Sequence, residues 1–140
     1  MTGAIRQALA VSLLALIPTA LAGLFHPKRP GWNGEAMGPD QISGAEVAVW
    51  KNAPLWVDAR PRRSYERGHI AGALLLNEDE WDELLPAVLS AWQPGRRVVV
   101  YCDSAACDSS KKLAERLREA GVPGVCVLHG GWAEWKARTP

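Results

Sequence analysis

The sequence predicts an α/β fold, a three-layer sandwich in which a central parallel sheet has helices on both faces. Short apolar runs at 55–59, 73–76, 97–102 and 124–131 alternate with segments whose apolar residues recur at helical spacing. Strands that alternate with helices pair in parallel, because each helix returns the chain to the same edge of the sheet. The run at 97–102 is apolar on both faces, as the central strand of a parallel sheet must be.

Two helices are predicted before the central strand. Ser43 can act as the N-cap of a first helix over 44–53, in which Val47 and Trp50 share one face. The second helix, over 77–92, begins with a group of acidic residues in its first turns, where the helix dipole favours negative charge. We expect these carboxylates to be solvated rather than to bind a metal.

Two more helices are predicted after the central strand. The segment 108–121 is amphipathic, with Leu113, Leu117 and Ala120 on one side. The segment 132–137 closes the domain as a short helix.

The first 40 residues differ in character from the rest of the chain. Residues 1–24 include most of a stretch of about 19 residues without charge, close to the ~20 residues that cross a bilayer. Two interpretations stay open, a retained membrane anchor or a signal peptide cleaved after small residues. Residues 25–40 predict a Pro/Gly linker, and 41–140 the folded domain. We expect the domain outside the cytoplasm, anchored or exported, in the periplasm if the organism is a bacterium.

Composition excludes several classes of function. The formal net charge is +1, so there is no large field of one sign and we expect no nucleic-acid partner. Three cysteines are too few for a disulfide framework and leave at least one thiol over. The membrane is an expected partner if the N-terminal segment is retained.

Cys102 lies where chemistry is expected in such a fold. It follows the central strand and precedes the helix over 108–121, and ligands of parallel sheets bind beyond the carboxyl ends of the strands. Backbone N–H groups and a helix N-terminus stabilise an anion there, lowering the pKa of a thiol and favouring the nucleophilic thiolate. The alternative is a small buried residue that ends a strand.

Three motifs resemble the rhodanese-like domain family. The stretch 57–76 is similar to the family signature D-x-R-x4-[YF]-x2-G-H-I-x-G-A, and VVVYC and LHGGWAEW resemble its catalytic strand and its closing element. The likeness covers about 41–138. The signature positions are Asp58, Arg60, Tyr65, Gly68, His69, Ile70, Gly72 and Ala73.

The resemblance implies a sulfurtransferase. In this family the cysteine takes a sulfane sulfur from a donor such as thiosulfate, becomes a persulfide, and passes the sulfur to a thiol or to a cyanide-like acceptor. Cys102 is then the catalytic residue, and neither a metal nor a cofactor is expected. The residues expected to cradle the sulfur are Asp103, Ser104, Ala105, Ala106, Cys107 and Asp108.

The cysteine loop departs from the family pattern in its charge. Many members have Arg or Lys inside the loop, often at its sixth position, where this chain has Cys107, and Asp103 adds a negative charge. A persulfide or polysulfide donor is therefore predicted rather than thiosulfate. The related phosphatases use Cys-x5-Arg, and Asp108 at the corresponding position argues against phosphate chemistry.

The roles of the other candidate residues are less determined. Cys107 either resolves a persulfide on Cys102 by forming a disulfide, or fills space before the helix. Asp58 and Arg60 are expected to tie loops together, and His69 to hydrogen-bond loop backbone. Trp132 is expected in the core or as a wall of the pocket. The alternative function is a non-catalytic rhodanese-like binding module or a thiol redox sensor that uses the two loop cysteines.

Overall fold

The computed structural model describes residues 37–138. The predicted membrane anchor or signal peptide at 1–24 lies outside the described residues, as does the linker up to residue 36. Within 37–138 no helix is both long and apolar enough to cross a bilayer. The location outside the cytoplasm stays a prediction.

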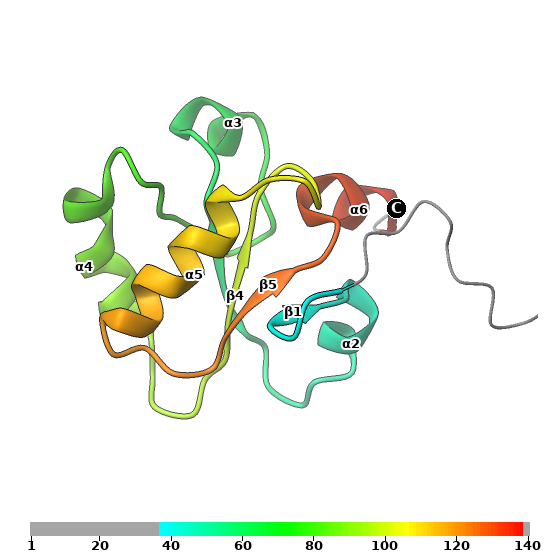
Figure 1. Cartoon of the computed structure of the whole chain (residues 1–140), viewed down its shortest axis with the longest axis horizontal. Coiled ribbons are helices and arrows are strands. Elements are labelled where there is room, and N and C mark those ends of the chain that lie inside the picture. The colour runs from blue at the N-terminus through cyan, green and yellow to red at the C-terminus, as the bar shows by residue number, and fades with distance from the viewer. Residues whose placement is uncertain (1–36, 139–140) are drawn as a thin grey trace, which may run out of the picture. The chain divides into compact units, whose positions relative to one another are not determined.

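A five-stranded parallel sheet forms the centre of the domain, in the order β1-β5-β4-β2-β3 (Figure 1). In its middle Val57 pairs with Val100, which pairs with Val127. All residues of β2 and β4 are buried, because helices cover both faces of these strands. The strands are β1 (Gln41–Ile42), β2 (Leu55–Asp58), β3 (Leu74–Leu75), β4 (Val98–Tyr101) and β5 (Val125–Leu128).

Alternate residues of the central strands face opposite helix layers, because successive side chains of a strand point to opposite faces. Val57 and Val100 pack in a core with α4 and α5, whereas Trp56 and Val99 pack in a second core with α2 and α6 (Figure 1). The three-layer α/β prediction is confirmed. The helices are α2 (Gly44–Ala48), α3 (Arg62–Arg67), α4 (Trp81–Ala91), α5 (Ser109–Glu119) and α6 (Gly131–Arg138).

Local signals account for the ends of α2 and the buried side of α5. Ser43 forms a capping box with Glu46 at the start of α2. The expectation for Ala120 is wrong, since this residue is exposed at the C-cap of α5. Ala120 is not part of the buried side because α5 ends at Glu119. Within the helix, Ala114 is buried beside Leu113.

Two short elements have no counterpart in the prediction. β1 consists of Gln41 and Ile42 alone, and its pairing with β5 is what makes it a strand. α3 buries none of its side chains, so it lacks the apolar periodicity by which a helix is recognised in a sequence. α3 nevertheless matters for the site, because it begins just beyond the carboxyl end of β2.

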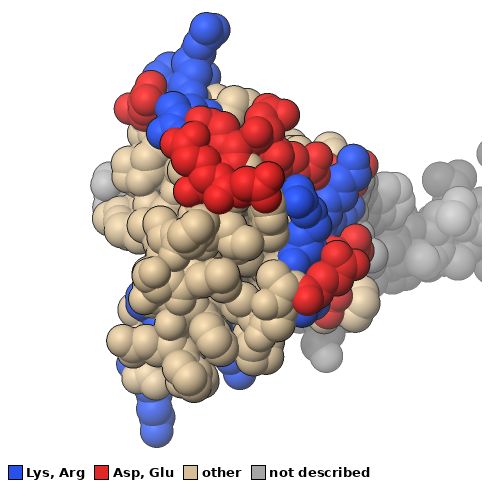
Figure 2. Space-filling view, turned by 90° about the vertical axis from the view of Figure 1, so that its left-hand side faces the viewer, with Lys and Arg blue, Asp and Glu red and all other residues tan. Residues whose placement is uncertain are grey.

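Acidic side chains gather on the side of the molecule that carries α4 (Figure 2). Glu78, Asp79, Asp82 and Glu83 are exposed, and Glu80 is half-buried. Hydrogen bonds from Asn77 and Arg62 lower the pKa of Glu80. The acidic group is solvated, as predicted, but α4 begins at Trp81, later than predicted, so only Asp82 and Glu83 lie in its first turn.

Candidate functional site

The cysteine loop leaves the carboxyl end of β4 and leads into α5. Cys102 follows Tyr101 directly and is 1% exposed, whereas Cys107 is half-buried and packs against the core beneath α4 and α5. The next residue, Asp108, is the N-cap of α5. The strand thus holds the first cysteine rigidly, and the second lies where the loop turns into the helix.

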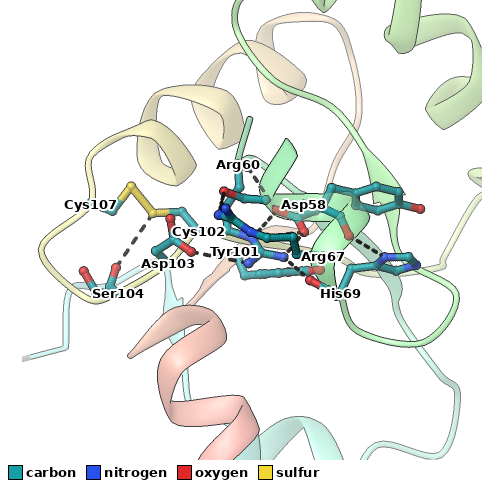
Figure 3. Close-up of polar contacts among 12 residues, drawn as sticks. Asp58, Arg60, Arg67, His69, Tyr101, Cys102, Asp103, Ser104 and Cys107 are labelled. Carbon is teal, nitrogen blue, oxygen red and sulfur yellow. Dashed lines mark hydrogen bonds and ion pairs between the residues drawn. A yellow bond between two sulfur atoms is a disulfide. The ribbon is translucent and has the colours of Figure 1, made fainter. Parts of the chain in front are cut away.

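Cys102 and Cys107 are joined by a disulfide (Figure 3), and their Cα atoms are 6.4 Å apart. Cys102 Sγ lies 3.9 Å from the carbonyl oxygen of Ser104, to which the reduced thiol can donate. The loop therefore brings its two sulfurs within bonding distance. A role for Cys107 in resolving a persulfide stays a prediction.

Backbone N–H groups of the loop are available to an anion. Cys107 N–H donates to Ser104 O at 3.3 Å. Within residues 37–138, the N–H groups of Ser104, Ala105 and Ala106 have no hydrogen-bond partner. Successive unpaired N–H groups in a tight turn form an anion-binding concavity. A persulfide or thiolate is the anion that a cysteine at this place would supply.

The start of α6 holds the loop from the other side. Trp132 N–H donates to Cys102 O at 2.7 Å, and Ala133 N–H donates to Asp103 O at 3.0 Å. Gly131 has φ +55°, and a Cβ there would overlap Cys102 O and lie 3.0 Å from Ser104 N. Only glycine lets the backbone of α6 approach the loop this closely.

Gly131→Ala is expected to displace the cysteine loop. The methyl group meets backbone atoms that cannot rotate away, and the positive φ adds about 1 kcal/mol of strain. We expect the free energy of unfolding to fall by about 2 kcal/mol and the reaction of Cys102 with a sulfur donor to slow about tenfold or more. Urea denaturation and stopped-flow loading measure the two effects.

Gly95→Ala is the matched control for this substitution. Gly95 also has a positive φ, +83°, but a Cβ there meets nothing within 4 Å. It should therefore lose only about 1 kcal/mol, through backbone strain alone, and keep the wild-type loading rate. Equal loading rates in the two variants would mean that the close approach of α6 is not needed.

Arg60 connects three segments beside the cysteine loop (Figure 3). Its guanidinium donates to both carboxylate oxygens of Asp58 at 2.7–3.1 Å, to Gly68 O at 2.7 Å and to Asp103 at 3.3 Å. Burial lowers the pKa of Arg60, but the hydrogen bonds and the charge of Asp58 outweigh it and raise the pKa. The cation stays charged, and Asp58 is fully buried against it.

His69 and Trp132 lie around this ion pair. His69 Nδ1 is 3.0 Å from Tyr65 O, and its ring stacks on Tyr65, on the far side of Arg60 from the disulfide (Figure 3). The ring of Trp132 lies 5.0 Å from the Arg60 guanidinium. His69 thus contacts the backbone of α3 and not the loop backbone that was expected. Trp132 contacts both the second core and a cavity beside the loop.

Comparison with known proteins decides the family. A family model described as the Rhodanese-like domain matches residues 44–138. The chain belongs to the rhodanese-like domain family. This confirms the resemblance that the three motifs indicated.

Individual relatives of this rhodanese-like domain are distant. It is 26% identical over 113 residues to the tRNA uridine(34) hydroxylase of Enterobacter sp. (strain 638), covering 78% of this chain and 32% of that protein. The chain thus spans about a third of that relative. Together, the family and this relative support a role in sulfur or redox chemistry of the kind found among rhodanese-like proteins.

Solved structures of rhodanese-like proteins share the fold. A rhodanese-like domain from Anabaena sp. is 25% identical with a TM-score of 0.57, covering 74% of this chain and 86% of that one. A rhodanese-related protein from Thermoplasma volcanium is 20% identical with a TM-score of 0.57, covering 71% and 94% of the two chains. These two proteins and this chain share one fold class.

Two cations near the loop were not predicted from the sequence, because a positive charge was expected only inside the loop. Arg67 from the last turn of α3 and Lys136 from α6 line a cavity next to Asp103. Arg67 lies inside the family signature, and Lys136 lies four residues after Trp132, one helical turn away. The rhodanese-like domain thus has positive charge beside its cysteine loop.

Proposed function

We propose that this rhodanese-like domain transfers sulfane sulfur through a persulfide on Cys102. The supporting observation is the place of Cys102, at the carboxyl end of β4 and followed by three unpaired N–H groups. The proposed donor is a persulfide or polysulfide rather than thiosulfate. Thiosulfate has its negative charge directly beside the transferred sulfur, where the loop offers Asp103 and no cation.

The first step is the loading of Cys102. Its thiolate attacks the outer sulfur of a donor R–S–SH, a bond forms from Cys102 Sγ to that sulfur, and the S–S bond of the donor breaks. The electron pair of the broken bond leaves on R–S⁻, and the proton stays on the transferred sulfur until it ionises. The N–H groups of Ser104, Ala105 and Ala106 then donate to the persulfide anion.

Two fates of the persulfide are open to this chain. An external thiolate or cyanide can take the outer sulfur and restore the Cys102 thiolate. Alternatively, the Cys107 thiolate attacks Cys102 Sγ, the bond to the outer sulfur breaks, and HS⁻ leaves. The product of the second route is the Cys102–Cys107 disulfide, which two molecules of a thiol reduce while they become a disulfide themselves.

The disulfide also favours a second candidate function, a thiol redox sensor. In that case an oxidant forms the Cys102–Cys107 bond, a thiol breaks it, and no sulfur atom is carried. The two functions differ in one observable, the appearance of an additional sulfur atom on the protein or of sulfide in solution.

A loading experiment on the full chain tests the proposal. The reduced protein is mixed with glutathione persulfide, inorganic polysulfide or thiosulfate, and intact mass, peptide mapping and released sulfide are measured. We expect either one additional sulfur on Cys102 or one sulfide per disulfide formed, at least about tenfold faster with the first two donors. Disulfide formation with neither product would contradict sulfur transfer and support the redox sensor.

Cys126 does not interfere with the assignment of the transferred sulfur to Cys102. It is the one free cysteine of residues 37–138, lies half-buried in β5, and burial raises its pKa. A raised pKa leaves less thiolate at neutral pH and makes a thiol a poor nucleophile. Peptide mapping assigns any sulfur found there.

A further inference from the structure

We propose that the cavity beside the cysteine loop binds the carboxylate of a small persulfide donor through Arg67 and Lys136. This inference rests on the proposed function and deepens it by naming the class of donor. The cavity has a volume of about 270 Å³. Its lining consists of Arg60, Ser64, Arg67, Gly68, Asp103, Trp132 and Lys136.

Two of the cations that line the cavity have no carboxylate partner among residues 37–138. Arg60 is held by Asp58 and by Asp103. Arg67 donates to the hydroxyl of Ser64 at 3.2 Å. Among residues 37–138 no carboxylate pairs with Arg67 or with Lys136, so these two charges are open to a ligand.

The exposed side chain of Lys136 lies over an aromatic ring. Its ammonium lies 5.4 Å from the centre of the Trp132 ring, and the Arg60 guanidinium lies 5.0 Å from the same ring. A cation held against a ring keeps its charge and its free N–H donors. The wall formed by Trp132 therefore presents an ammonium to the cavity, and α3 presents a guanidinium.

Two residues that line the cavity are connected to Cys102 through the backbone. Asp103, which lines the cavity, follows Cys102 directly, and Trp132 N–H is hydrogen-bonded to Cys102 O. Both cations nevertheless belong to helices outside the loop. A donor that suits this arrangement has its negative charge several bonds away from its sulfur, as an amino-acid or peptide persulfide has. Thiosulfate has sulfur and charge on adjacent atoms.

The volume of the cavity agrees with a donor of this kind. A cavity of about 270 Å³ lies just below the range of ~300–1,000 Å³ for drug-sized ligands. It accommodates a fragment the size of one or two amino acids, with the rest of a peptide in solvent. Arginine binds a carboxylate through two parallel N–H donors, and lysine adds a point charge.

Two donors that differ in charge test the proposal. Glutathione persulfide has carboxylates, and the persulfide of 2-mercaptoethanol has none. Arg67→Gln and Lys136→Gln are each expected to lower kcat/KM for loading by glutathione persulfide about tenfold, and to change loading by the persulfide without a carboxylate less than twofold. Each substitution removes the charge and leaves a polar, uncharged side chain.

Arg63→Gln is the matched control, because Arg63 is exposed on the same helix and lies outside the cavity lining. It should load both donors as the wild type does. Unchanged loading by glutathione persulfide in the Arg67 and Lys136 variants would overturn the carboxylate site, and so would an equal loss with both donors. A wild-type protein that loads neither donor would instead overturn the proposed sulfur transfer.

Discussion

Cys107→Ser is expected to trap the transferred sulfur on Cys102. The serine hydroxyl cannot attack a persulfide as a thiolate does, so the internal route to sulfide is closed. After one exposure to glutathione persulfide the variant should hold one additional sulfur for minutes or longer. Sulfide release in the absence of added acceptor should fall at least about 100-fold. Intact mass and a sulfide electrode measure the two quantities on the same sample.

Cys102→Ser is the companion variant for the nucleophile itself. Removal of a nucleophile abolishes covalent catalysis, so loading and sulfide release should both fall by more than about 1,000-fold. If Cys107→Ser releases sulfide as fast as the wild type does, the disulfide has no part in turnover. If Cys102→Ser still gains a sulfur on Cys107, the two cysteines have been assigned the wrong roles.

Asp58→Asn is expected to cause the largest loss of stability among the substitutions considered. Asp58 is fully buried and Arg60 is 3% exposed, so the amide leaves a buried guanidinium without its main counter-charge. Removal of one partner of a buried ion pair costs about 3–5 kcal/mol. Contacts of Arg60 with Gly68 O and Asp103 remain, and we therefore expect a loss near 3 kcal/mol in urea denaturation.

Glu134→Gln provides the comparison for an exposed pair. Glu134 pairs with Arg138 one helical turn away, and the Arg138 side chain is 49% exposed. Solvent screens such a pair, and its removal should cost less than about 1 kcal/mol. Losses of similar size for the two variants would contradict a structural role for the Asp58–Arg60 pair beneath the loop.

The cysteine loop is held from three directions by backbone and buried charge. The loop starts at the end of β4, and N–H groups near the start of α6 donate to its carbonyls. Arg60 donates a hydrogen bond to the Asp103 side chain. These contacts restrain the loop whose N–H groups the proposed persulfide would use. Preorganised donors of this kind stabilise charge without a cost of reorganisation during the reaction.

Much of the fold was predictable from local patterns. The runs at 55–57 and 98–102 are apolar without interruption, as is typical of strands that are buried on both faces. The amphipathic stripe of α5 and the capping box at Ser43 likewise depend on residues close in the sequence. α3 and β1 were missed because one buries no side chain and the other exists only through its pairing with β5.

The candidate site, like the fold, was only partly predictable from the sequence. Its nucleophile was visible because a cysteine between an apolar strand and an amphipathic helix is a local pattern, and the family motifs placed Asp58, Arg60 and Trp132 near it. The cations were not visible, because Arg67 and Lys136 are 69 positions apart in the chain and meet only where α3 and α6 border the same cavity.

By itself the sequence determined the α/β layers, the family and the cysteine at the carboxyl end of β4, since each follows from residues within one segment or motif. Only the tertiary structure decided that the two loop sulfurs lie within bonding distance, that glycine is required where α6 meets the loop, and that positive charge reaches the site from outside. These depend on distances between segments, which packing of the helices on the sheet sets and no local pattern encodes.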